Sequence, residues 1–235
     1  MLGQAVGELS PQDACLVDFA RTLTARPWAV GPADIRRLSE VGLSRTSIAL
    51  VIGLVALFNY LTRVADGTGI EPDYDTELPQ FAYRGITEAA ERPEPAEWPS
   101  VDGSLELLSL IPDVQAAWSR WRAYVLESPA PVPVATRGQL RVIAARNACD
   151  GAIAAPGVAG SPGEALSNFA GKLSRTPWLM ASSDVAALRS TGLGDLSILH
   201  VIAVVAYQSA ESRLRMGLAA LTRSEDEPFA PASSE

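Results

Sequence analysis

The sequence is poor in the residues that hold metal ions or crosslink a chain. Its 235 residues include one histidine and two cysteines, Cys15 and Cys149. A four-coordinate zinc site needs several Cys and His side chains together, so the sequence predicts no metal site and gives no sign of a cofactor. Two cysteines also cannot build a disulfide framework. The fold must therefore rest on its apolar core.

Positive charge is also in short supply, with 19 Lys and Arg against 27 Asp and Glu, a net charge of −8. Binding to phosphate backbones requires a clustered basic face, so we expect no nucleic-acid partner. The first residues have neither the basic stretch nor the apolar stretch of an export signal. The most apolar run, 48–61, is shorter than the roughly 20 residues that span a bilayer. We therefore expect a cytoplasmic protein without a membrane partner, in which this run forms a buried helix.

An internal repeat organises the chain. Residues 16–70 are matched without a gap by residues 166–220, at a constant offset of 150. The identical pairs include Leu16/Leu166, Phe19/Phe169, Leu23/Leu173, Pro27/Pro177, Trp28/Trp178, Asp34/Asp184, Gly42/Gly192, Arg63/Arg213 and Gly67/Gly217. The repeat predicts two related helical units. Residues 101–155 precede the second copy and have no counterpart before the first.

Apolar spacing and capping residues predict three helices in each copy. In the first copy they cover 11–25, a short stretch between Pro32 and Gly42, and 44–66. The second copy repeats them from 162 to about 221. We expect further helices over 105–127, with a break at Pro112, and over 136–155.

The Pro- and Glu-rich stretch 71–100 predicts a surface connector between the copies. The resulting division is a partial unit at 1–70, the connector at 71–100, a second unit at 101–223 and a disordered tail at 224–235.

Two segments carry a resemblance to a known family. Residues 17–70, with their ALFNYLTRVADG run, closely resemble the rear half of peroxidase-related proteins in the alkylhydroperoxidase D-like / carboxymuconolactone decarboxylase superfamily. Residues 105–155, with RNAC at 146–149, are similar to the front half. The resemblance implies an all-α fold of tandem alkylhydroperoxidase D-like helical units, the first lacking its front half with the cysteine helix. It also implies a homo-oligomer.

The resemblance further implies that dithiol peroxidase activity is lost. Peroxidases of this family use a Cys-x-x-Cys helix together with a His and a Glu. The first Cys falls on Cys149, but the other three positions fall on Ala152, Pro156 and Arg137. A sulfenic acid formed at Cys149 would have no resolving thiol. Cys149 is then either a one-cysteine nucleophile whose pKa is lowered by Arg146, or a small buried apolar group.

The two long helices of the repeat differ along one side. The first copy has apolar residues there, at Leu50, Leu54, Phe58, Leu61 and Ala65, where the second has His200, Val204, Gln208, Glu211 and Arg215. One hypothesis is a substrate pocket in the second unit. Glu211 would then be the general base, His200 an acid or base, Gln208 a hydrogen-bond donor and Arg215 the anchor of an anionic substrate. The alternatives are a solvated face and a satisfied structural network.

Other residues of the repeat suggest structural roles. Asn59, Arg63 and Asp66 form a polar face on the first long helix. Because Arg63 and Arg213 are identical across the repeat, we expect a shared structural contact, either an ion pair or an interaction with a helix C-terminus. The five tryptophans are expected in the core or at subunit contacts.

Three functional hypotheses follow. The first is a diverged small-molecule enzyme that uses acid–base chemistry in the second unit. The second is a catalytically silent structural or regulatory homologue that pairs with an intact subunit. The third is a one-cysteine protein that uses Cys149.

Overall fold

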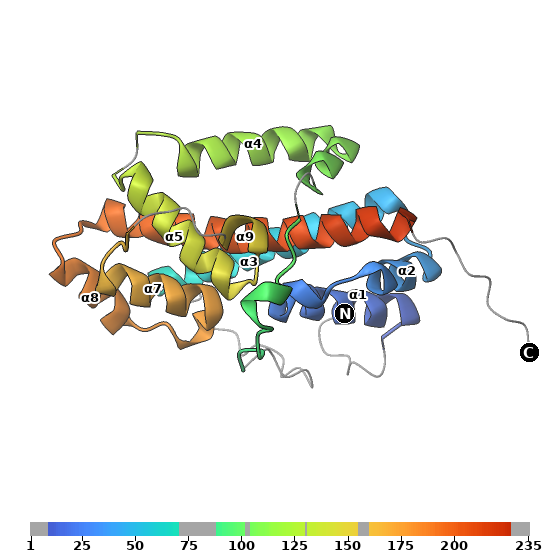
Figure 1. The fold of residues 1–235 in the computed structure, drawn as a ribbon, viewed down its shortest axis with the longest axis horizontal. Coiled ribbons are helices and arrows are strands. Elements are labelled where there is room, and N and C mark those ends of the chain that lie inside the picture. The colour runs from blue at the N-terminus through green and yellow to red at the C-terminus, as the bar shows by residue number, and fades with distance from the viewer. Residues whose placement is uncertain (1–8, 71–87, 102–103, 130, 155–159, 227–235) are drawn as a thin grey trace, which may run out of the picture.

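The chain is all-helical in the computed structural model, which describes residues 9–70, 88–101, 104–129, 131–154 and 160–226 (Figure 1). No strand occurs in these ranges, so the predicted all-α class is confirmed. Both copies of the repeat have the same order of elements. The first copy consists of α1 (Pro11–Ala25), the 3-10 turn η2 (Pro27–Ala29), α2 (Pro32–Glu40) and α3 (Arg45–Thr68). The second consists of α7 (Glu164–Arg175), η5 (Pro177–Leu179), α8 (Ser182–Ser190) and α9 (Asp195–Asp226).

Local sequence signals set the helix boundaries of the first copy. The Ser10 and Ser44 hydroxyls accept hydrogen bonds from the backbone N–H groups of Asp13 and Ser47, each at 3.1 Å. These bonds satisfy donors that the first turns of α1 and α3 leave free. After α2 the chain turns through Gly42, whose φ of 92° favours glycine. The predicted starts of α1, α2 and α3 are therefore confirmed.

Helices α3 and α9 lie side by side through the middle of the molecule (Figure 1). A Cβ atom on Gly67 would lie 3.0 Å from Cγ2 of Ile202, and one on Gly217 would lie 2.7 Å from Cγ2 of Ile52. These two contacts are related by the offset of 150. Each joins the second half of one helix to the first half of the other, so the helices are antiparallel and the copies are related by a pseudo-two-fold axis. The two sequence units therefore share their central packing.

The segment before the second copy forms η4 (Ser104–Leu110), α4 (Pro112–Leu126), α5 (Val134–Asn147) and α6 (Gly151–Ala154). The predicted break at Pro112 is confirmed, but the single helix predicted over 136–155 is wrong. Cys149 has a φ of 55°, and the N–H of Asp150 donates to the carbonyl of Ala145 at 2.9 Å. This left-handed cap ends α5, so Cys149 lies past the helix and not on it.

Other boundaries also differ from the expectation. α7 begins at Glu164, because Gly163 before it has a φ of 99° that does not continue a helix. α9 continues past 221 to Asp226, so the start of the predicted disordered tail is helical. In the predicted connector, the described part 88–100 contains the 3-10 turn η3 (Pro95–Glu97). The rest of the connector (71–87) and of the tail (227–235) lies outside the described residues.

The prediction that 48–61 forms a fully buried helix is wrong for one face of α3. Five apolar side chains on this face, which we call the α3 strip, are 42–56% exposed: Leu50, Leu54, Leu57, Phe58 and Leu61. The equivalent side of α9 is buried, because α4 and α5 pack against it. The first copy has no counterpart of α5 among the described residues, so the strip stays open.

By length and composition alone, α3 could cross a membrane. It has 24 residues, and an 18-residue stretch within it has a mean hydropathy of 1.9, with 33% of that stretch buried inside the protein. Helices α8 and α9 are long and apolar enough to cross a membrane only when taken together, and they are bent by 120° at the break between them. A buried core helix has the same composition, so these figures carry little weight by themselves.

Candidate functional site

The polar side of α9 is buried in the protein. His200, Gln208 and Glu211 are 7%, 0% and 2% exposed, and Arg215 is half-buried. The alternative that this face is solvated is therefore wrong. In α3 the equivalent apolar side chains are the exposed ones. The two other interpretations of the buried side of α9 are a reaction site and a structural network.

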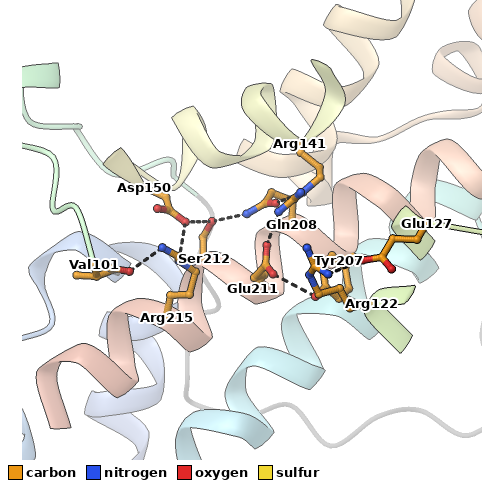
Figure 2. Close-up of polar contacts among 10 residues, drawn as sticks. All are labelled: Val101, Arg122, Glu127, Arg141, Asp150, Tyr207, Gln208, Glu211, Ser212 and Arg215. Carbon is orange, nitrogen blue, oxygen red and sulfur yellow. Dashed lines mark hydrogen bonds and ion pairs between the residues drawn. The ribbon is translucent and has the colours of Figure 1, made fainter. Parts of the chain in front are cut away.

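Glu211 lies in a chain of polar contacts between α5 and α9 (Figure 2). Arg141 of α5 donates to Oε2 of Glu211 at 2.8 Å and to Oε1 of Gln208 at 2.7 Å. The Tyr207 hydroxyl donates to Oε1 of Glu211 at 3.1 Å. Burial and the adjacent Glu211 raise the pKa of Tyr207, which keeps the phenol protonated as a donor. Both carboxylate oxygens of Glu211 are thus occupied by protein donors.

The chain of contacts continues to a second carboxylate, Asp150 (Figure 2). Gln208 donates to the Ser212 hydroxyl at 3.1 Å, and Ser212 donates to Oδ2 of Asp150 at 2.7 Å. Arg215 lies 3.9 Å from the same oxygen and donates to the Val101 carbonyl at 2.6 Å. Burial raises the pKa of Asp150. The network therefore balances two carboxylates, Glu211 and Asp150, with two guanidinium groups, Arg141 and Arg215. Asp150 and Arg141 are not among the residues that the sequence predicts for this site.

His200 belongs to a different set of contacts. Its Nε2–H donates to the Val125 carbonyl at the end of α4, at 2.9 Å, and its Nδ1 has no partner among the described residues. Burial lowers the pKa of His200, and the charge of Arg137 lowers it further. Arg137, at the position of the family's Glu, donates to the carbonyls of Val132 and Ser128, each at 2.7 Å. His200 and Arg137 thus hold the turn between α4 and α5, and no described contact links His200 to Glu211.

Cys149 does not have the surroundings of a reactive thiol. Its side chain is 0% exposed, and burial raises its pKa to about 11, although Arg92 and Arg175 act in the opposite direction. The expectation that Arg146 lowers this pKa is wrong. The Arg146 side chain is exposed, and its described link to Cys149 is a backbone hydrogen bond. The interpretation of Cys149 as a small buried apolar group agrees with these observations.

A pocket of about 190 Å³, which the sequence analysis did not predict, lies between the two copies. Its lining includes four pairs related by the repeat: Thr24 with Ser174, Ala25 with Arg175, Trp28 with Trp178, and Arg63 with Arg213. The pocket therefore lies at the pseudo-two-fold axis. The identical Trp and Arg residues at equivalent positions of the repeat are the signal in the sequence, which by itself predicts packing and a structural contact but no pocket.

The shared structural contact expected for the two arginines is confirmed. Arg63 donates to the Ser174 carbonyl at 3.1 Å, and Arg213 donates to the Thr24 carbonyl at 2.6 Å from Nη2. These carbonyls belong to the last turns of α7 and α1, so each long helix binds the C-terminal end of a helix in the other copy. Burial lowers the pKa of Arg63 to about 10 and lowers that of Arg213 as well.

In the described ranges, no cluster of three or more His, Cys, Asp and Glu side chains is placed to hold a metal ion. A search of protein-family models finds no match to this chain, and a search of curated proteins finds no relative. The kinship of residues 17–70 to the alkylhydroperoxidase D-like superfamily therefore stays a prediction based on the resemblance.

Proposed function

We propose that this chain is a diverged alkylhydroperoxidase D-like protein that has lost dithiol peroxidase chemistry and works as a homo-oligomeric structural or regulatory protein. The α3 strip is the observation that carries the proposal. Soluble monomers rarely expose a continuous apolar surface of this kind, and such surfaces mark interaction sites.

The composition of α3 favours a second copy of this chain as the partner. Between Thr46 and Thr62 the helix has no charged residue, so its outer face can pack against an identical face without leaving a charge unpaired. A contact of this kind is isologous, which is the commonest symmetry of soluble dimers. The strip continues into an apolar groove of about 420 Å³, lined on the other side by residues of α4 that include Val114, Trp118 and Trp121.

The burial energy of such a contact is comparable to the cost of association. Complete burial of a Leu or Phe side chain contributes about 1.5–3 kcal/mol, and the five side chains of the strip are about half exposed. Two copies therefore gain on the order of 8–15 kcal/mol. The loss of translational and rotational freedom costs about 4–15 kcal/mol. The two ranges overlap, so the buried apolar area is of the size that association requires, and the affinity is set by how well the two faces fit.

The surroundings of Cys149 support the loss of peroxidase chemistry. A thiol attacks peroxide as the thiolate, and burial raises the pKa of this one to about 11. The equivalent of the resolving cysteine is Ala152. The chain therefore lacks both the reactive thiolate for attack on peroxide and the second thiol that would resolve the sulfenic acid.

Light scattering of the purified full chain tests the proposal. The wild type should have about twice the monomer mass of 24.8 kDa at micromolar concentration. Leu54→Asp should shift it to the monomer, because a carboxylate would be buried in the contact. The matched control is Leu196→Asp on α9, where the side chain is 77% exposed and outside the strip.

Two results would contradict this proposal. One is a wild type that remains a monomer. The other is an oligomer that Leu54→Asp leaves intact. Flotation of the wild type with lipid vesicles, lost in Leu54→Asp, would instead assign the strip to a membrane surface.

Acid–base catalysis at Glu211 is the second candidate function. The observation in its favour is the number of ionisable side chains buried along α9, because such side chains cluster at reaction sites more often than in simple cores. Against it, both carboxylate oxygens of Glu211 already accept hydrogen bonds. Its test is the stability of Glu211→Gln, described in the Discussion.

A further inference from the structure

The pocket at the pseudo-two-fold axis contains positive charge that the protein leaves unbalanced. The side chains of Arg63 and Arg213 are buried, with 4% and 5% of each residue exposed. Their described hydrogen bonds go to backbone carbonyls and to the Asn59 amide oxygen, all of them neutral acceptors. Buried guanidinium groups are normally paired with carboxylates. Arg141 follows that rule with Glu211. The described hydrogen bonds of Arg63 and Arg213 include none to a carboxylate, and Asp66 acts on Arg63 through its charge alone.

The two guanidinium groups also retain donors for a ligand. The described hydrogen bonds of each use three of its five N–H groups. Nε of Arg63 also has no partner in the described part of the chain, but it is sealed off from solvent and from the pocket. The donors left for a ligand are therefore the remaining Nη N–H groups of the two arginines.

Other charged side chains also line the pocket, and positive charges outnumber negative ones. Arg92 and Arg175 also line it, against two carboxylates, Asp66 and Glu88. Arg92 is held in place by a 3.0 Å hydrogen bond to the Asn147 amide oxygen. Four guanidinium groups and two carboxylates leave an excess of two positive charges, which attracts an anion into a cavity with low-dielectric walls.

The charges of the two buried arginines act on one another. The positive charge of Arg63 lowers the pKa of Arg213, in addition to the larger effect of burial. The equivalent of Asp66 in the second copy is Met216, so Arg213 has no acidic neighbour at the equivalent place. An anion between the two groups would remove this repulsion and stabilise the fold.

The size and walls of the pocket limit what can enter. Its volume of about 190 Å³ is on the order of six water molecules, at about 30 Å³ each. Trp28 and Trp178 contribute indole rings to the lining, which suit a planar or apolar ligand body. A small molecule with one anionic end fits these limits.

We propose that the pocket between Trp28 and Trp178 binds a small oxyanion, a carboxylate or a phosphate, through Arg63 and Arg213. Guanidinium groups suit both because their parallel N–H groups match two oxygens of either anion. The site goes beyond the proposed association through α3. Arg63 is buried against α7, whereas the α3 strip faces outward.

Calorimetric titration of the full chain with sodium phosphate and, separately, with sodium benzoate tests the site. At least one of them should bind saturably at millimolar or lower concentration, and the one that binds more tightly identifies the class of anion. Asp66→Asn should strengthen that binding about threefold or more, because it removes a carboxylate from the lining. Arg175→Gln, an exposed position, should weaken it by a similar factor.

The matched control is Arg189→Gln, which removes one exposed positive charge that pairs with Asp195 outside the pocket and should leave affinity unchanged. Arg213→Gln should abolish binding if the variant folds, and the two milder variants test the site if it does not. Absence of binding for both anions would overturn the proposal. Binding that is equal in Asp66→Asn, Arg175→Gln and wild type would overturn it as well.

Discussion

Replacing Gly217 by alanine tests the antiparallel packing of α3 on α9. The new Cβ would lie 2.7 Å from Cγ2 of Ile52, closer than real Cβ contacts allow. Ile52 is 0% exposed, so it has little room to move. Overpacking of a core costs about 1–3 kcal/mol, and a close backbone-to-core contact belongs near the upper end. Alanine gains about 1 kcal/mol over glycine in helix propensity. The free energy of unfolding should therefore fall by about 1–2 kcal/mol.

Thermal unfolding followed by circular dichroism measures this effect. A loss of 1–2 kcal/mol in a chain of this size lowers Tm by about 2–8 °C. Gly171→Ala in the middle of α7 is the matched control, because a Cβ there meets no atom within 4 Å. That variant should keep or raise Tm. A Gly217→Ala protein as stable as the Gly171→Ala protein would refute the close approach of the two helices.

Three further predictions concern the buried side chains Glu211, His200 and Cys149. Glu211→Gln should lower the free energy of unfolding by about 2–3 kcal/mol, because it leaves the charge of Arg141 poorly paired. Unchanged stability together with loss of an activity would instead favour the acid–base hypothesis. The pKa of His200 is lowered in the folded state, so the unfolded chain takes up this proton first as pH falls below about 6.5. The stability of wild type relative to His200→Gln, measured by urea denaturation, should therefore decrease between pH 8 and pH 5.5, and a constant difference would contradict this. Purified wild type should show no dithiol-dependent turnover of alkyl hydroperoxides, and turnover that disappears in Cys149→Ser would contradict the loss of peroxidase chemistry.

Local structure was predictable because its signals lie close together in the sequence. Ser10, Ser44 and Gly42 mark helix boundaries through bonds to residues only a few positions away. The exact repeat offset predicted the matching order of elements. The end of α5 was missed because a cysteine, and not a glycine, occupies the left-handed position at residue 149.

Exposure was harder to predict because it depends on which helix covers which face. The same side of the long helix is open in α3 and buried in α9, and the sequence of that side alone predicts the opposite assignment. The cover comes from α4 and α5, whose positions follow from contacts distant in sequence. The Arg63–Arg213 pocket was missed for the same reason, since it forms only when the two copies meet.

Crosslinking through α3 most directly tests the central claim that this helix joins two copies of the chain. Leu57→Cys would place a thiol on the α3 strip, in a background where the partly exposed Cys15 is replaced by serine and the buried Cys149 is kept. Mild oxidation should convert this protein to a covalent dimer on a non-reducing gel, whereas Leu196→Cys in the same background should remain monomeric. Because a disulfide bridges the copies only if Leu57 lies near the two-fold axis, the same proteins are also treated with a flexible bis-maleimide. A Leu57→Cys protein that neither reagent crosslinks more than Leu196→Cys would contradict the claim.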